Sequence, residues 1–207
     1  MSVMVVGVGP GNPAYCTPAA WKEIQNAELL VGAKRLLQDF ARDDQKQLPI
    51  GKDLQGLLQQ VEQRRHQERI VVMVSGDTGL YSLASYLARN MNADDLIFIP
   101  GISSVQYLFA QLKRSWQGVQ ILSVHGRFPF HLAELVKGGR VTALLTGYPW
   151  SPARIAGCLL EDGVGNLPVV LGVALSYPDE QLIHTNLQLL STDHNQYENT
   201  VMVIFNE

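Results

Sequence analysis

The sequence of 207 residues predicts an α/β protein of two domains, each a β-sheet flanked by helices. In the first half, short apolar runs that end at a glycine or a turn alternate with helical stretches. That order is typical of a mostly parallel sheet covered by helices on both faces. In the second half, strands follow one another with fewer helices between them, so we expect a mixed sheet there. A chain of this length is able to bury a core in each half.

The first half begins with an apolar strand that leads into a glycine-rich turn. Thr17 then caps a helix that has Pro18 at its first position. Further apolar runs and helical periodicity continue the alternation along the chain. The expected strands are 3–6, 27–31, 70–74 and 96–99, and the expected helices are 17–26, 33–40, 53–65, 79–90 and 102–112.

A polar stretch at 113–118, which contains Trp116 and Gly118, separates the two halves and predicts a domain junction near 114–118. We therefore expect an N-terminal α/β domain at 1–114, which carries the glycine-rich loops, and a C-terminal mixed α/β domain at 119–207. The expected elements of the second domain are strands at 119–124, 141–145, 168–174, 181–185 and 200–205, with one helix at 151–161.

Composition excludes several classes of protein. Hydrophobic residues make up 46% and charged residues 17%, as in a globular chain, and the formal net charge of −3 argues against nonspecific nucleic-acid binding. No apolar run approaches the roughly 20 residues that span a bilayer, and no charged region precedes an apolar leader. We expect a cytoplasmic protein with reduced thiols at Cys16 and Cys158. The five histidines do not cluster at ligand spacings, so no metal site is expected.

Four loops that contain glycine follow predicted strands, at 7–11, 75–79, 100–104 and 125–127. In open parallel sheets, ligands bind beyond the carboxyl ends of the strands, so these loops are the expected ligand site. The first loop departs from the dinucleotide motif G-x-G-x-x-G, because it has Pro10 inside the turn and Asn12 in place of the third glycine. A nicotinamide or flavin enzyme therefore fits poorly and stays only as an alternative.

Five motifs together resemble those of the tetrapyrrole methylases. They are V-G-x-G-P-G-x-P at 6–13, S-G-D at 75–77, P-G-I-S-S at 100–104, H-G-R at 125–127 and L-S-Y-P-D-E at 175–180. Members of this family transfer a methyl group from S-adenosylmethionine (SAM) to intermediates of cobalamin and sirohaem synthesis. The length and the S-G-D-T-G-L-Y-S form of the second motif are most similar to the CbiE branch. That branch methylates carbon-5 of cobalt-precorrin-7 or precorrin-6Y.

The resemblance implies that SAM lies in a cleft between the two domains and leaves as S-adenosylhomocysteine. It also implies a homodimer. The carbon-15 methyltransferase/decarboxylase that is fused to some relatives is expected here as a separate protein. On matching positions, the implied SAM-binding residues are Pro10, Gly76, Asp77, Leu80, Ser103, Ser104, Thr146, Ala174 and Thr200.

Two of these residues have a structural interpretation beside the functional one. Asp77 is suited to accept hydrogen bonds from the amino-acid part of SAM, and it is also suited to cap a helix that starts near Gly79. Ser103 is likewise an N-cap candidate. Thr78 stands where many members of the family have proline, which affects the assignment to a branch rather than the fold.

Candidate residues for the acceptor follow from its chemistry. Precorrins carry many carboxylates, so Lys34, Arg35 and Arg127 are the expected substrate-binding cations. His125 is the candidate for moving a proton, and the alternative is a histidine that only hydrogen-bonds its turn. The stretch 31–35 lacks the acidic residue of the uroporphyrinogen methyltransferases, so their base is not transferred to this chain.

Three functions remain open on the sequence alone. The first is the cobalt-precorrin carbon-methyltransferase, and close to it stands a member of the same family with another acceptor, such as a different ring position or diphthine. The second is a nicotinamide-dependent oxidoreductase. The third is a module that binds SAM or a tetrapyrrole without turnover.

Overall fold

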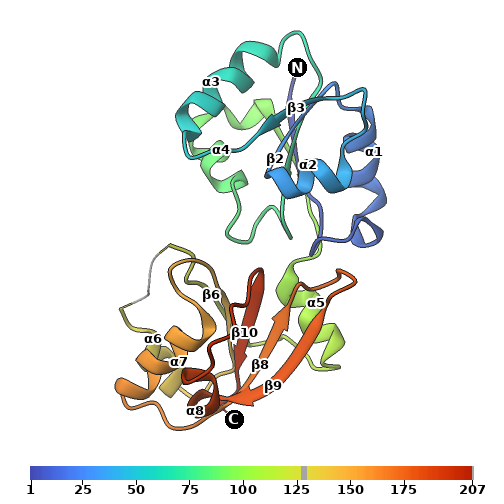
Figure 1. Ribbon diagram of the computed structural model, residues 1–207. Coiled ribbons are helices and arrows are strands. Elements are labelled where there is room, and N and C mark those ends of the chain that lie inside the picture. The colour runs from blue at the N-terminus through green and yellow to red at the C-terminus, as the bar shows by residue number, and fades with distance from the viewer. Residues whose placement is uncertain (127–129, 207) are drawn as a thin grey trace. The chain divides into compact units, whose positions relative to one another are not determined.

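The computed structural model describes residues 1–126 and 130–206, which form two compact units at 1–104 and 105–207 (Figure 1). Each unit is a sheet with helices on it, and the first sheet is parallel while the second is mixed, so the predicted fold class is confirmed. The units divide about ten residues before the predicted junction at 114–118. Helix α5 (Ser104–Gln111) belongs with the second unit by its contacts, although the sequence placed it at the end of the first.

The sheet of the first unit has the strand order β3-β2-β4-β1-β5, and all its pairs are parallel. Every predicted strand of this half is present. The additional strand β3 was not predicted because it is a polar edge strand with no apolar run. The elements are β1 (Val3–Gly7), α1 (Pro18–Asn26), β2 (Leu29–Gly32), α2 (Lys34–Phe40), β3 (Lys46–Pro49), α3 (Leu54–Arg64), β4 (Ile70–Val74), α4 (Ala84–Asn90) and β5 (Leu96–Ile99), with short 3-10 helices at Pro13–Tyr15 and Ala93–Asp95.

Side-chain alternation along the strands builds a core on each face of this sheet. In β4, Ile70, Val72 and Val74 pack under α3 and α4, whereas Val71 and Met73 pack under α1 and α2. The two pairs of helices accordingly lie on opposite sides of the sheet in Figure 1. Burial on both faces explains why these strands are continuous apolar runs, which made them easy to predict.

The topology of this sheet determines where a ligand is able to bind. From β1 the chain crosses to β2 on one side of the sheet, and from β4 it crosses to β5 on the other side. Neighbouring parallel strands whose connections leave in opposite directions open a crevice at their carboxyl ends. In this unit the pair is β1 and β4, which places the loops 7–11 and 75–79 at the crevice.

The sheet of the second unit has the order β6-β7-β10-β8-β9, in which only β6 and β7 are parallel. The sequence missed α6 and α8, which are only six and five residues long. None of the helices among the described residues is long and apolar enough to cross a membrane. Beside α5, the elements are β6 (Gln120–Ser123), α6 (Leu132–Lys137), β7 (Thr142–Leu145), α7 (Pro152–Glu161), β8 (Pro168–Val173), β9 (Gln181–Asn186), α8 (Leu187–Ser191) and β10 (Thr200–Ile204).

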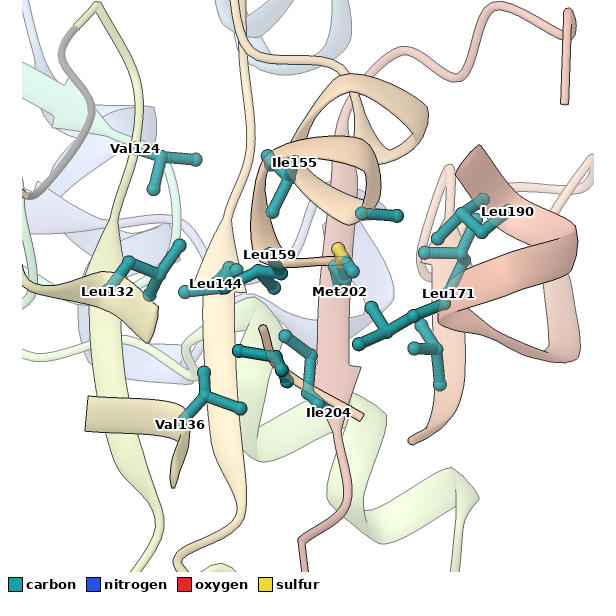
Figure 2. Close-up of a cluster of buried hydrophobic side chains, with 14 residues drawn as sticks. Val124, Leu132, Val136, Leu144, Ile155, Leu159, Leu171, Leu190, Met202 and Ile204 are labelled. Carbon is teal, nitrogen blue, oxygen red and sulfur yellow. The ribbon is translucent and has the colours of Figure 1, made fainter. Parts of the chain in front are cut away.

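The main core of the second unit joins strands β7, β8 and β10 to helix α7. Leu144, Leu171 and Met202 point from the sheet toward Ile155 and Leu159 of the helix, and all five are completely buried (Figure 2). Helix α5 covers the opposite face. A Cβ placed on Gly172 of β8 would lie 2.8 Å from Cδ2 of Leu175 and 2.9 Å from Cδ1 of Leu108 in α5, so the missing side chain leaves room for both leucines.

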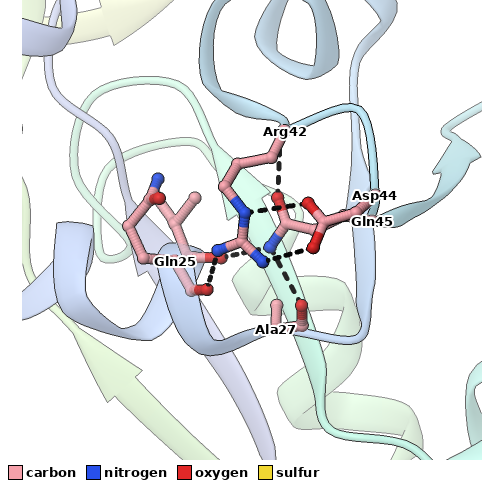
Figure 3. Close-up of polar contacts among 6 residues, drawn as sticks. Gln25, Ala27, Arg42, Asp44 and Gln45 are labelled. Atoms are coloured by element: carbon pink, nitrogen blue, oxygen red, sulfur yellow. Dashed lines mark hydrogen bonds and ion pairs between the residues drawn. The ribbon is translucent and has the colours of Figure 1, made fainter.

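A polar cluster closes the carboxyl end of α1 in the first unit (Figure 3). The amide nitrogen of buried Gln45 donates to the carbonyls of Ile24 and Ala27, at 2.7 and 2.9 Å, and its oxygen accepts from the N–H of Arg42 at 2.9 Å. Arg42 pairs with Asp44 through two hydrogen bonds and donates to the carbonyl of Gln25. These side chains satisfy carbonyls that have no partner inside the helix.

Gln45→Ala is expected to lower the free energy of unfolding by about 2–3 kcal/mol, because it removes the side-chain partner of the Ala27 carbonyl and of the Arg42 N–H and one of the two donors to the Ile24 carbonyl. Urea unfolding measures the change. Gln59→Ala, at an exposed position of α3, is the matched control and should stay within about 0.5 kcal/mol of the wild type. Equal effects of the two variants would contradict the assignment of a capping role to Gln45.

Candidate active site

Three glycine loops meet at the carboxyl edge of the first sheet, because the strands β4, β1 and β5 that precede them are neighbours. Gly9 and Gly76 exchange two backbone hydrogen bonds, at 3.2 and 2.8 Å. Both have left-handed backbone, with φ of +88° and +70°. Only glycine adopts this conformation readily, so the sequence pattern and the loop geometry agree.

The third loop approaches the other two too closely for any side chain. A Cβ on Gly101 would lie 2.3 Å from the carbonyl oxygen of Gly76 and 2.5 Å from that of Gly7. A Cβ on Gly7 would lie 2.6 Å from the same oxygen of Gly76. We call Gly7, Gly9, Gly76 and Gly101 the glycine junction. It is a surface of main chain alone, at the crevice where the topology predicts a ligand.

Asp77 ties the second loop to the third. Its Oδ1 accepts from the N–H of Gly79 at 2.8 Å, and its Oδ2 accepts from the N–H of Gly101 at 3.1 Å. The predicted helix start near Gly79 is wrong, because α4 begins at Ala84. The side chain of Asp77 holds a turn at 77–79 instead, so Leu80 lies in the turn that precedes the helix and not in its first turn.

The other predicted residues of the first unit lie close to this edge. Pro10 is buried between the glycines of the first loop. Ser103 is 4% exposed, and its Cα lies 3.5 Å from the position that a Cβ on Gly76 would take. Ser104 is the first residue of α5, so Ser103 occupies the position before the helix. These residues surround the glycine junction, while their contact with SAM stays a prediction.

The predicted acceptor cations begin helix α2, directly after β2. Because β2 is the neighbour of β4, the guanidinium of Arg35 reaches the second loop, where Nη2 donates to Oγ of Ser75 at 3.1 Å. Lys34 is exposed beside it. Arg127, the third predicted cation, lies outside the described residues.

The predicted residues of the second unit gather at one end of its sheet. Oγ1 and the N–H of Thr146 both donate to the carbonyl of Thr200, at 2.8 and 3.2 Å. Thr200 also pairs with Val173, the residue before Ala174. The backbone of Ala174 is left-handed, with φ of +47°, which is uncommon for a residue other than glycine. The sequence therefore predicted three residues that share one edge, although nothing in their geometry tests cofactor binding.

A cavity of about 680 Å³ opens at this end of the second unit. His125 and Thr146 line it on one side, together with Trp150, and the segment 193–199 lines it on the other. The sequence analysis missed this segment, whose only signal is its polarity. Within it the N–H of Asn195 and the hydroxyl of Tyr197 lower the pKa of Asp193, and that carboxylate raises the pKa of Tyr197.

His125 stands exposed on the wall of this cavity, just beyond β6. Its backbone N–H donates to Oγ of Ser123 at 3.4 Å. Among residues 1–126 and 130–206, its imidazole has no hydrogen-bond partner. The ring therefore does not hold the described part of its turn through a hydrogen bond.

Other polar groups of the sequence have structural roles. Glu180 accepts from the N–H of Ser176 at 2.5 Å and so braces the turn that contains Tyr177 and Pro178. Burial raises the pKa of the Cys16 thiol to about 11, which makes it a poor nucleophile at neutral pH. In the part of the chain that the structure describes, no three His, Cys, Asp or Glu side chains gather into a metal site.

A second hollow, of about 750 Å³, lies at the opposite end of strand β8. Arg114, Pro168, His184 and Phe205 are among the residues that line it, and the Arg114 guanidinium lies 4.6 Å from the centre of the Phe205 ring. None of the described site residues predicted from the sequence belongs to it. Of these two hollows, the cavity at His125 is the one that coincides with the sequence motifs.

Comparison with known proteins places these motifs in a family. Residues 2–190 match the family model described as Tetrapyrrole (Corrin/Porphyrin) Methylases. The chain is 32% identical over 203 residues to a protein of Salmonella typhimurium named cobalt-precorrin-7 C(5)-methyltransferase, and the match covers 98% of each chain.

Solved structures agree on the fold. A precorrin-6Y methylase from Archaeoglobus fulgidus superimposes with a TM-score of 0.77 at 22% identity, covering 100% of this chain and 98% of the other. A uroporphyrin-III C-methyl transferase from Thermus thermophilus, solved in complex with S-adenosylhomocysteine, gives a TM-score of 0.81 at 18% identity, with coverage of 99% and 97%. At these identities the likeness establishes the architecture of the chain and no more.

Proposed function

The chain belongs to the tetrapyrrole methylase family, and on that premise we propose that it is a SAM-dependent methyltransferase of corrin biosynthesis. Its proposed acceptor is carbon-5 of cobalt-precorrin-7 or precorrin-6Y. The observation that carries this proposal is the end-to-end similarity to a relative named for the carbon-5 reaction. The expected membership in the family is thereby confirmed, and the oxidoreductase alternative does not agree with it.

The residues at the first sheet's edge fit SAM. The glycine junction packs the three loops together at the crevice, and Pro10 and Ser103 flank it. Each carboxylate oxygen of Asp77 accepts one backbone N–H and has a further lone pair, which is suited to the ammonium of SAM. Bound SAM supplies a methyl group that is already activated on its sulfonium, so the protein has no covalent intermediate to form.

The chain's own residues then position the acceptor and move its proton. Holding the acceptor in line replaces a bimolecular encounter and supplies most of the catalysis. Lys34 and Arg35 are proposed to bind its carboxylates, with the planar guanidinium suited to two hydrogen bonds. Binding of the acceptor by Arg127 stays a prediction from the sequence. His125, exposed on the cavity of the second unit, is proposed to take the proton that leaves the ring system.

The cofactor proposal is tested by calorimetric titration of the protein with S-adenosylhomocysteine. Asp77→Ala is expected to weaken binding at least about tenfold, which corresponds to ~1.4 kcal/mol. Asp53→Ala is the matched control. Oδ1 of Asp53 also accepts a backbone N–H at 2.8 Å, from Gly56, but this residue caps α3 after the outer strand β3. Its variant should bind as the wild type does.

Two results would count against this assignment. Equal weakening in both variants would mean that loss of a loop hydrogen bond, and not loss of the Asp77 carboxylate, explains the effect. Absence of binding by the folded wild type would remove the SAM proposal itself. A parallel titration with NAD is expected to give no heat of binding.

Transfer of a methyl group to cobalt-precorrin-7 in vitro discriminates the remaining alternatives. Turnover of this acceptor supports the carbon-5 assignment, turnover of another tetrapyrrole or of diphthine supports a sister activity, and binding without turnover supports a binding module. The homodimer, the cytoplasmic location and a separate carbon-15 methyltransferase/decarboxylase belong to the same proposal.

A further inference from the structure

His125 and Gly147 each lie two residues beyond the end of one of the parallel strands β6 and β7. In the register of β6 and β7, Ser123 lies opposite Leu145, and the N–H of Val124 donates to the carbonyl of Leu145 at 3.0 Å. Continued by two residues, this register places His125 opposite Gly147. Both residues line the cavity of about 680 Å³.

The imidazole of His125 occupies the space where residue 147 would carry a side chain. A Cβ on Gly147 would lie 1.9 Å from Nδ1, 2.7 Å from Cε1 and 2.9 Å from Cγ of His125. Any residue other than glycine therefore excludes the ring from its present position. The backbone of Gly147 is not left-handed, so the need for glycine is steric and not conformational.

The backbone at Gly147 is fixed on both sides. Before it, Thr146 donates two hydrogen bonds to the carbonyl of Thr200. After it, the N–H of Trp150 donates to the carbonyl of Gly147 at 2.7 Å. The imidazole, in contrast, sits at the end of an exposed side chain, which has other rotamers to adopt. When a methyl group is added at position 147, the ring moves and the main chain stays.

We propose that Gly147 is a positioning residue, which seats the imidazole of His125 on the wall of the cavity by leaving its own side-chain space empty. We call this placement of the ring against Gly147 the seat of His125, and it follows from the geometry of the second unit alone. Its effect on turnover rests on the proposed function of His125. The two statements are separable by experiment.

The seat is tested by NMR on the full chain, through the Cε1–Hε1 signals of the five histidines. The signal of His125 is identified by its loss in His125→Ala. Gly147→Ala is expected to move this signal and to leave those of His66 and His184, which do not line the cavity, in place. Gly157→Ala is the control, because a Cβ on Gly157 in α7 meets nothing within 4 Å, and it should move none of these signals. An unmoved His125 signal in Gly147→Ala would overturn the proposal.

Turnover with SAM and cobalt-precorrin-7 gives the second readout. Gly147→Ala is expected to lower kcat at least about tenfold, a fraction of the 10²–10⁴ that a proton-transfer group supplies, while binding of S-adenosylhomocysteine stays unchanged. In a His125→Ala background the same substitution should lower kcat no further. Equal losses in both backgrounds would overturn the catalytic part of the proposal.

The failure of the proposed function has a different signature. If His125→Ala itself keeps full turnover while Gly147→Ala still moves the His125 signal, the seat is supported and the role of His125 in proton transfer is refuted.

Discussion

Gly101→Ala is expected to destabilise the protein by about 3 kcal/mol or more, from overpacking together with the loss of a charge-assisted hydrogen bond. The added Cβ would lie 2.3 to 2.6 Å from backbone atoms of Gly76 and Gly7. The main chain of Gly7 and Gly76 has no alternative rotamer that would make room for the added Cβ, so the loops must separate. Their separation also removes the hydrogen bond from the N–H of Gly101 to Asp77.

Urea unfolding and titration with S-adenosylhomocysteine measure this effect together. Gly51→Ala is the matched control in the same unit, because a Cβ there meets nothing within 4 Å and its backbone is not left-handed. It should stay within about 0.5 kcal/mol of the wild type. A Gly101→Ala protein of unchanged stability would show that the three loops are not packed together as described.

The second large effect is expected for His125→Ala, which should lower kcat by about 10²-fold or more and leave the affinity for S-adenosylhomocysteine unchanged. The backbone hydrogen bond from residue 125 to Ser123 survives the substitution, so the turn keeps its support. His184→Ala, at an exposed position of β9 that lines the other hollow, is the control and should keep full turnover. A His125→Ala enzyme with normal kcat and a raised KM would assign His125 to acceptor binding instead.

The sequence predicts the central strands well because burial on both faces makes each one an unbroken apolar run, as in Ile70–Val74. The sequence does not predict β3, because the strand Lys46–Pro49 is polar and forms by pairing with β2. It also starts α4 too early. Periodicity alone does not show that the Asp77 side chain holds a turn before Ala84.

The candidate site, like the fold, is predicted from the sequence only in part. Glycine loops at strand ends carry their own signal, since few other residues adopt the conformation of Gly76 or permit the approach of Gly101. The seat of His125 depends on contact with Gly147, 22 residues away, and the cavity wall at 193–199 is brought there by the fold. Such long-range contacts leave no local pattern in the sequence.

The glycine junction has a consequence for selectivity. Its polar groups are amides and carbonyls of the main chain, which are the same in every protein, so they do not distinguish one ligand from another. We expect discrimination between acceptors to depend on side chains instead, such as Lys34 and Arg35 of the first unit and the segment 193–199 of the second. Arg35 also donates to Oγ of Ser75 in the second loop, whereas Lys34 is exposed, so Lys34 is the first position to change when the enzyme is to be retargeted.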